Sequence, residues 1–375
     1  MQKYRIGIIG YGGFGKFLHN WWSKLDNVEI VAIADSKVDV GEVAGCNVYR
    51  HWEDLVAAGN IDIVSIVTPP SVHAEIACAA LYAGKHVLVE KPVAISLHQA
   101  ENILKAQQET GKVVMVNHML RYNPIVEALA TISSQMIFGK LRHATVSNYA
   151  QDNSLPIDHW FWNRDFSGGI FVEHGVHFID IISSLTHSKF KDVKGVWHDR
   201  NDRQRDQVAA LVHYEDGLIA HHYHAFSGPG FFEQTTIRLT FDLAKIEVEG
   251  WIPMLGTVKG LVNSETKMKL DALPGYKQVA CSSINGQADE SRPAGWGDTG
   301  NIGEKGIEFG GISYQVDEII EGNFQIESTK DDIYGSCVQK LLLDMINVIE
   351  DKNHKPKVSL KDAIESLRIA LLASE

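Results

Sequence analysis

The sequence predicts an α/β protein in which an N-terminal doubly wound parallel sheet precedes a C-terminal α+β domain built on a largely antiparallel open sheet. Short apolar runs alternate with helical stretches through the first third of the chain, which is typical of a parallel sheet with helices on both faces. Beyond about residue 138 the runs are rich in β-branched and aromatic residues, which favours antiparallel strands. With 375 residues, the chain is also longer than one average domain.

The expected elements of the first domain follow from apolar runs and from helix-ending residues. A helix is expected over residues 74–83, because Gly84 stands where a helix often ends in glycine. The proline of Arg121-Tyr-Asn-Pro124 marks a change of pattern, so the expected domains are 1–122 and 123–375. The strand-like runs are 4–9, 28–34, 61–67, 86–89 and 113–116.

The second domain is expected to hold an antiparallel sheet with few helices. Tyr214-Glu-Asp-Gly217 has the composition of a hairpin turn between two strand-like runs. Residues 281–311 contain eight glycines and few aliphatic side chains, which predicts a long loop or arm. The strand-like runs are 141–149, 207–214, 218–224 and 235–241, and the expected helices lie around 170–185 and 333–350.

The final segment predicts an amphipathic helix over residues 359–373. Ser359-Leu-Lys-Asp362 has the form of a capping box, which starts a helix. Ile364, Leu367 and Leu371 then recur at helical spacing. This helix is a candidate for packing back on the first domain.

Composition and charge exclude several classes of function. The net charge of −12 and the pI of about 5.8 argue against nucleic acid and membrane surfaces as partners, because both bind basic patches. No apolar stretch approaches the roughly 18–20 residues of a membrane span, and Gly7 and Gly10 interrupt the N-terminal run, unlike a signal peptide. Four scattered cysteines without a Cys-x-x-Cys pair fit a reducing compartment. The expected location is the cytoplasm.

The N-terminus carries the pattern of a dinucleotide-binding turn. The apolar run from Ile6 to Ile9 leads into Gly10-Tyr-Gly12-Gly-Phe-Gly15, and a helix is expected from about Phe14. Glycines let the backbone approach a pyrophosphate, and the helix directs its free N–H groups toward the phosphates. The residues expected to bind a nicotinamide or flavin dinucleotide here are Gly10, Gly12, Gly13, Phe14 and Gly15.

Asp35 ends the second apolar run and lies 20 residues beyond Gly15. A carboxylate at this position can accept hydrogen bonds from the adenosine ribose, and it repels the 2′-phosphate of NADP. Lys37 could partly offset that repulsion. We therefore expect NAD rather than NADP, with Asp35 and Ser36 among the residues that bind it.

Two further segments are expected at the sheet edge where a doubly wound fold binds its ligand. Thr68-Pro-Pro-Ser-Val-His73 and Glu90-Lys91-Pro92 each follow a strand-like run. The Lys91 ammonium could polarise a hydroxyl or carbonyl group and transfer a proton, although a solvated loop lysine is the alternative. The residues expected to line the cofactor crevice are Thr68, Pro69, His73, Glu90 and Lys91.

Over essentially its whole length, the chain resembles the glucose–fructose oxidoreductase/inositol dehydrogenase/MocA (Gfo/Idh/MocA) family. The most specific motif is Ala83-Gly-Lys-His-Val87 followed by Glu90-Lys91-Pro92. The other motifs are the glycine turn, the segments 68–73 and 121–124, the stretch 167–180 and the closing stretch 358–371. The resemblance implies an N-terminal Rossmann domain, a C-terminal domain with a largely antiparallel sheet, and NAD(P)-dependent dehydrogenation of sugars, polyols or related alcohols.

The resemblance also implies roles for three residues. Lys91 matches the family's catalytic lysine, and His177 matches the catalytic histidine that ends an Asp-x-Gly-x-His pattern. Here the pattern reads Glu173-His-Gly-Val-His177, so a glutamate replaces the usual aspartate, and on a helix it shares one face with His177. We expect His177 to take the hydroxyl proton and Lys91 to stabilise charge on the oxygen. Glu173 is expected to orient His177 or to hold a neighbouring hydroxyl.

Other residues carry two interpretations each. The aromatic segment 158–164 could stack on a sugar ring through Trp162, or could be a core strip. Arg121 could contact a carboxylate, a phosphate or the nicotinamide, or could pair with a structural acid. Asp180 is expected to cap or pair on its helix. The expected substrate contacts are Lys91, Arg121, Tyr122, Trp162, Glu173 and His177, and Arg121 is also expected at the cofactor.

The segment His221-His222-x-His224 invites a metal hypothesis. On a strand, only His222 and His224 share a face, and no cysteine lies nearby in the sequence. We therefore expect no metal ion.

Three functions remain open from the sequence. The first is an oxidoreductase that acts on the CH–OH group of a small carbohydrate-like molecule. The second is an enzyme that recycles a tightly held NAD during glycoside cleavage or epimerisation. The third is a non-catalytic dinucleotide-binding regulator, which the presence of both Lys91 and His177 disfavours. By resemblance, a homo-oligomer (dimer or tetramer) is expected.

Overall fold

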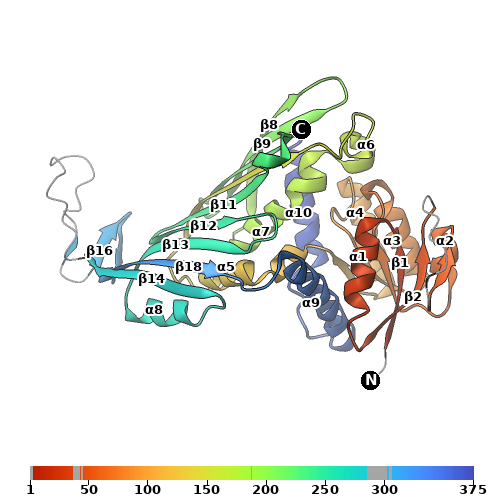
Figure 1. Ribbon diagram of the computed structural model, residues 1–375, viewed down its shortest axis with the longest axis horizontal. Coiled ribbons are helices and arrows are strands. Elements are labelled where there is room, and N and C mark those ends of the chain that lie inside the picture. Colours follow the sequence, from red (N-terminus) through yellow and green to blue (C-terminus); the bar gives the residue numbers. More distant parts are fainter. Residues whose placement is uncertain (1–2, 37–42, 44, 187, 285–301, 304–305) are drawn as a thin grey trace.

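A computed structural model describes residues 3–36, 43, 45–186, 188–284, 302–303 and 306–375, and Figure 1 shows a parallel sheet and a larger open sheet with helices between them. The first sheet has the strand order β3-β2-β1-β4-β5-β6, and every pair in it is parallel. Its strands are β1 (Tyr4–Ile9), β2 (Val28–Ala34), β3 (Asn47–Tyr49), β4 (Ile63–Ile66), β5 (His86–Val89) and β6 (Val114–Val116). This order reverses between β1 and β4, and ligands bind at such a switch point.

Helices cover the parallel sheet because its strands are apolar on both faces. Ile6, Ile8, Ile33 and Ile63 are fully buried, as expected of a sheet that has no solvent face. The helices of this region are α1 (Gly13–Trp22), α2 (Trp52–Ala57), α3 (His73–Tyr82) and α4 (Leu97–Thr110), with short 3₁₀ turns at Pro70–Val72 and Met119–Tyr122. Helix α3 confirms the expected helix, and Gly84 has a φ of +78° just past its end.

The second sheet has nine strands in the order β14-β18-β13-β12-β11-β7-β10-β9-β8 within the described residues. Neighbouring strands are antiparallel except β7 and β10, which are parallel. The strands are β7 (Leu141–Gln151), β8 (Phe190–Asp199), β9 (Arg205–Tyr214), β10 (Ile219–Gly228), β11 (Gln234–Phe241), β12 (Ala244–Glu249), β13 (Leu255–Val262), β14 (Tyr276–Ser283) and β18 (Glu318–Gln325). The expected fold class is therefore confirmed.

Among the described residues, helices pack on one face of this sheet. Helix α7 packs on β7 and β10, and α5 packs on α7, while the opposite face is open (Figure 1). The helices of this region are α5 (Pro124–Ser134), α6 (Arg164–Ser167), a π-helical turn (Phe171–Gly175), α7 (Val176–Leu185) and α8 (Ser264–Asp271), with 3₁₀ turns at Trp160–Trp162 and Gly230–Phe232. The expected hairpin joins β9 to β10, and Gly217 has a φ of +92° in its turn.

The glycine-rich segment 281–311 only partly matches the expected loop. Strand β14 extends to Ser283, and residues 302–303 and 306–309 form β15 (Ile302–Gly303) and β16 (Gly306–Phe309), which pair with β17 (Ile312–Tyr314). The described part of the expected loop or arm therefore contains short paired strands, which glycine weakens but does not prevent. Residues 285–301 and 304–305 lie outside the described residues.

The last two helices return to the first domain. Helix α9 (Lys330–Glu350) packs on α1, where Trp22 Nε1 donates to Val338 O at 3.0 Å and Gln339 Nε2 donates to Trp21 O at 2.7 Å. Helix α10 (Leu360–Leu372) begins with the expected capping box at Ser359 and packs on α7, α4 and β6. Helix α10 therefore lies between the two sheets, as Figure 1 shows. None of the helices in the described part of the chain is long and apolar enough to cross a membrane.

Candidate active site

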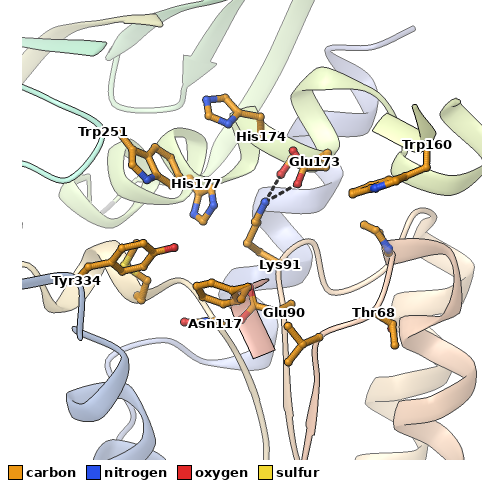
Figure 2. A pocket seen from close by; sticks show the side chains of 14 residues that line it. Thr68, Glu90, Lys91, Asn117, Trp160, Glu173, His174, His177, Trp251 and Tyr334 are labelled. Atoms are coloured by element: carbon orange, nitrogen blue, oxygen red, sulfur yellow. Dashed lines mark hydrogen bonds and ion pairs between the residues drawn. The ribbon is translucent and has the colours of Figure 1, made fainter. Parts of the chain in front are cut away.

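A cavity of about 290 Å³ lies between the carboxyl ends of the parallel strands and the helices of the second sheet (Figure 2). The parallel sheet contributes the segments after β4, β5 and β6, and the second domain contributes the π-helical turn and the start of α7. The lining residues are Phe14, Val67, Thr68, Pro70, Glu90, Lys91, Asn117, Met119, Trp160, Glu173, His174, His177, Trp251 and Tyr334. The structure thus brings Lys91, Glu173 and His177 to one cavity.

Lys91 and Glu173 form an ion pair across this cavity. Lys91 Nζ donates to the backbone oxygen of Glu173 at 2.7 Å and to its Oε1 at 2.8 Å (Figure 2). The side chains are 15% and 17% exposed, so water screens the pair weakly. Burial alone would raise the pKa of Glu173, but the Lys91 ammonium and His174 outweigh it and hold that pKa below its ordinary value. Glu173 is therefore a carboxylate that fixes the position of the ammonium.

Local backbone structure explains why Glu173 can make both contacts. Gly168 and Gly169 precede the turn with φ values of +80° and +92°, a conformation that side chains disfavour. The chain then forms the π-helical turn Phe171–Gly175 before α7 begins at Val176. Such wide turns often occur at functional sites, because they redirect a backbone carbonyl and a side chain.

His177 lies on the first turn of α7 and is 5% exposed. Its ring packs perpendicular to Trp251, with centroids 4.7 Å apart, and its Nδ1 is buried without a hydrogen-bond partner among the described residues. Burial and then the nearby Lys91 ammonium hold the pKa of His177 well below its ordinary value. The imidazole is therefore neutral at physiological pH and able to accept a proton.

Glu90 and Asn117 form a second buried polar pair at the cavity floor. Asn117 Nδ2 donates to Glu90 Oε1. Burial raises the pKa of Glu90 to about 7, although Asn117 and Lys91 oppose that shift. Asn117 Oδ1 and Thr68 Oγ1 are buried without hydrogen-bond partners within the described part of the chain, so each is available to a bound ligand.

A larger cavity of about 570 Å³ adjoins the first at the carboxyl ends of β1, β2 and β4. Val67 and Thr68 line both cavities. The lining includes Gly10, Gly12, Asp35, Ser36, Thr68 and Pro69, all predicted to bind the cofactor. Tyr11 N donates to Asp35 Oδ2 at 2.8 Å, which fixes the carboxylate beside the glycine turn.

The glycine turn fits a dinucleotide. A Cβ at Gly10 would lie 2.4 Å from Val67 O, and one at Gly15 would lie 2.2 Å from Gly10 O, so both positions need glycine for the turn to close. Apart from their chain neighbours, no described residue comes within 4 Å of an ideal Cβ at Gly12 or Gly13, so the backbone there faces open space. A pyrophosphate can approach that backbone directly. Phe14 lies beside the turn and lines the smaller cavity.

Four residues assigned to ligands from the sequence lie elsewhere. Arg121 pairs with Asp180 through Nε at 2.7 Å and Nη2 at 2.6 Å, so its structural alternative is the one observed. Tyr122 donates to Asp344 and is 3% exposed.

Trp162 lines other cavities and donates from Nε1 to Leu155 O. His73 is fully buried and bridges Thr68 O and Pro92 O, both at 2.8 Å, so it braces the Lys91 loop instead of facing the cavity.

Several residues that line the cavity were not predicted from the sequence. Asn117 follows β6 at the same sheet edge as Lys91, so the strand-end rule could have identified it. Trp160 stands two residues before the predicted Trp162. Trp251 follows β12 and Tyr334 lies on α9, and no local pattern connects either to the site. The missed lining residues are Val67, Pro70, Asn117, Met119, Trp160, His174, Trp251 and Tyr334.

The histidine segment 221–224 does not lie at the cavity. His222 and His224 are fully buried on the inner face of β10, and His221 points to the other face. No group of three side chains suited to a metal ion occurs within the described residues.

Comparison with known proteins matches two consecutive segments of the chain to one family. An oxidoreductase family with an NAD-binding Rossmann fold, GFO_IDH_MocA, matches residues 4–118. The C-terminal domain of the same family matches residues 126–246.

Individual curated relatives match only part of the chain. The 1-carboxy-3-chloro-3,4-dihydroxycyclohexa-1,5-diene dehydrogenase of Comamonas testosteroni is 29% identical over 264 residues, which are 67% of this chain and 62% of the relative. The 4-carboxy-2-hydroxymuconate-6-semialdehyde dehydrogenase of a Sphingobium species is 41% identical over 194 residues, which are 48% of this chain and 58% of the relative. The chain thus spans 62% and 58% of the length of these two curated relatives.

A solved structure extends the likeness to the whole fold. The WlbA dehydrogenase from Bordetella pertussis, in complex with NADH and UDP-GlcNAcA, has a TM-score of 0.72 and 17% identity, covering 100% of this chain and 95% of that one. At this identity the likeness concerns the fold. The two family matches confirm the resemblance seen in the sequence: the chain belongs to the Gfo/Idh/MocA family of oxidoreductases.

Proposed function

We propose that this protein transfers a hydride between a nicotinamide and a secondary alcohol or carbonyl of a sugar, cyclitol or related polyol. The observation that carries the proposal is the convergence of Lys91, Glu173 and His177 in a cavity that adjoins the glycine turn. Two of the relatives support the substrate class: one is named for a cyclic diol and the other is solved with a sugar nucleotide. A nicotinamide bound beside the cavity supplies the hydride chemistry.

The three residues divide the remaining work. Lys91 is held by Glu173 and directs its remaining N–H toward the substrate oxygen, where it stabilises developing negative charge. The neutral His177 takes the hydroxyl proton during oxidation and returns it during reduction. Trp160, Trp251 and Tyr334 give the cavity aromatic walls that suit the C–H face of a ring.

We propose NAD as the preferred cofactor. Asp35 lines the larger cavity, and its carboxylate disfavours a 2′-phosphate. Arg50 also lines that cavity and is the one described cation there able to attract a phosphate. Lys37, which could act in the same way, lies outside the described residues. The balance favours NAD because Asp35 adjoins the glycine turn directly.

The open face of the second sheet supports a homo-oligomer. Val196, Leu211, Ile219 and Tyr149 are between 45% and 66% exposed on that face. Exposed apolar side chains grouped on a sheet face in this way are commonly covered by another chain. We propose that a second copy covers it, giving a dimer or a tetramer.

Turnover of a polyol panel tests the proposal. The purified protein with NAD is expected to form NADH from at least one sugar or cyclitol, and more efficiently than with NADP. Lys91→Ala and His177→Ala should each lower kcat by roughly 100-fold or more while cofactor affinity stays within about threefold, because neither residue lines the larger cavity. Full turnover in either variant would refute the assignment. Cofactor binding without any net NADH would favour a recycled cofactor or a regulator.

A further inference from the structure

A row of three buried side chains leads away from the cavity behind His177. The ring of His118 lies perpendicular to that of His177, with centroids 6.3 Å apart and an interplanar angle of 89°. His118 Nδ1 lies 3.7 Å from Asp180 Oδ2. The exposed fractions of His177, His118 and Asp180 are 5%, 1% and 1%. His177 and Asp180 lie one turn apart on α7, so they share a face, and His118 reaches that face from the segment after β6.

We propose that His118 and Asp180 are positioning residues that fix the tautomer of His177. This inference rests on the proposed function. Asp180 keeps a proton on His118 Nδ1, which leaves His118 Nε2 as an acceptor for the Nδ1–H of His177. His177 then presents an unprotonated Nε2 to the substrate hydroxyl.

The donors and acceptors available on Asp180, His118 and His177 support this sequence of hydrogen bonds. A neutral imidazole has one donor and one acceptor nitrogen, whereas a carboxylate only accepts. Asp180 therefore selects the tautomer in which His118 Nδ1 carries hydrogen. The Nδ1 atoms of His118 and His177 are both buried without hydrogen-bond partners among the described residues. Such contacts are often long in a ligand-free site, and they close by a small shift or through one water molecule.

The charges around the row keep Asp180 ionised. Asp180 accepts two hydrogen bonds from Arg121 and one from Ser366 Oγ at 3.3 Å. Burial would raise the pKa of Asp180, but Arg121 and His118 outweigh it and hold that pKa below its ordinary value. Asp362, 4.0 Å from Arg121, faces the other side of the guanidinium.

The groups around His177 oppose its protonation, and the row formed by His118 and Asp180 offsets that effect. Burial lowers the pKa of His177, and Lys91, His118, His174 and His224 lower it further. During oxidation the substrate O–H bond breaks, its proton moves to His177 Nε2, and the hydride on the same carbon leaves for the nicotinamide. The imidazolium so formed keeps its Nδ1–H on His118, and the Asp180 carboxylate stabilises its charge through that ring.

Steady-state kinetics of His118 variants test the proposal. His118→Phe keeps an aromatic ring but cannot accept a hydrogen bond, so kcat should fall by roughly 10-fold or more while KM changes less than about threefold. The acid limb of the pH profile of kcat/KM should also shift, because the variant removes both the hydrogen-bond acceptor of His177 and a neighbouring imidazole that lowers the pKa of His177. His118→Gln retains a polar group near the Nε2 position and should restore part of kcat. His222→Phe removes a buried imidazole that makes no ring contact with His177, and should leave kcat and the pH profile unchanged.

Nitrogen NMR of histidine-labelled protein gives a readout that does not need turnover. In the wild type, His177 should carry hydrogen on Nδ1, and in His118→Phe the population should shift toward the Nε2–H tautomer. An unchanged kcat and pH profile in a folded His118→Phe variant, or an Nε2–H tautomer of His177 in the wild type, would overturn the proposal. If the wild type oxidises no polyol, the proposed function fails, and the tautomer measurement still decides this inference.

Discussion

At the scale of single residues, the contact between Lys91 and Glu173 sets the geometry of the site. The ammonium makes two hydrogen bonds to one residue, which leaves one N–H for the substrate. The Glu173 carboxylate reaches Lys91 through a side chain one methylene longer than that of aspartate. The residue that replaces the usual aspartate therefore contacts Lys91: Glu173 holds the lysine, where the sequence suggested that it orients His177 or holds a neighbouring hydroxyl.

Removing the charge or the length of Glu173 should lower turnover. Glu173→Gln retains the shape but not the ion pair, and Glu173→Asp is too short to keep the 2.8 Å contact. We expect kcat to fall roughly 10- to 100-fold in both variants, because a displacement of about 1 Å in a catalytic group costs that much. Steady-state kinetics check this, with Glu75→Gln on the exposed side of α3 as the control. Wild-type kcat in Glu173→Gln would show that the ion pair is dispensable.

At the scale of elements, helix α9 connects the packing of the first domain to the cavity. Tyr334 on α9 lines the cavity, and the next residue, Gly335, lies directly against α1. An ideal Cβ at Gly335 would lie 2.0 Å from ring atoms of Trp21, so the two helices approach as closely as they do only because this position is glycine. The close approach places the Tyr334 side chain at the site.

Gly335→Ala should destabilise the protein. In an exposed helix the change would stabilise by about 1 kcal/mol, but here the clash with Trp21 dominates and overpacking costs about 1–3 kcal/mol. The free energy of unfolding in urea should therefore fall, and KM should rise as Tyr334 moves. Ser336→Ala on the same helix serves as the control. A stabilised Gly335→Ala variant would contradict the observed packing.

The positions of the strands and helices explain which parts of the site could be predicted from the sequence. The positions of Thr68, Glu90 and Lys91 follow from strands whose carboxyl ends share one edge, and the same rule covers Asn117. Arg121 could not be placed, because a guanidinium suits a ligand and a buried acid equally, and only the tertiary fold puts Asp180 beside it. Trp251 and Tyr334 reach the cavity through contacts between segments far apart in the chain.

At the scale of the whole molecule, buried histidines set the response to acid. Two of these histidines, His174 and His177, line the cavity. The other two, His222 and His224, are fully buried on the inner face of β10, where His224 contacts the His174 ring. Burial lowers the pKa of His174 to about 4 and that of His222 to about 3, from an ordinary value of 6.5. His177 and His224 have pKa values well below 6.5 for the same reason.

Stability should therefore fall as pH drops below about 6.5. Below that pH the unfolded chain binds protons that the folded protein excludes. The contribution of these histidines to the free energy of unfolding is therefore complete above pH 6.5, and it is lost progressively as the pH falls toward their pKa values in the folded protein. Each such histidine adds a slope of about 1.4 kcal/mol per pH unit. In His222→Phe, the slope of the free energy of unfolding against pH should fall by about 1.4 kcal/mol per pH unit between pH values of roughly 4 and 6. Urea unfolding at several pH values measures this slope. An unchanged slope would mean that His222 titrates normally.

The return of α9 to α1 has a consequence for biosynthesis. A nascent chain leaves the ribosome from its N-terminus, so the strands and helices up to β6 emerge more than 200 residues before α9. During that interval the Trp22 indole N–H and the Trp21 carbonyl lack their partners, since Val338 and Gln339 supply them later. The early half of the polypeptide must then wait as an incompletely packed intermediate in which the α9-facing side of α1 is uncovered, a species that chaperones bind.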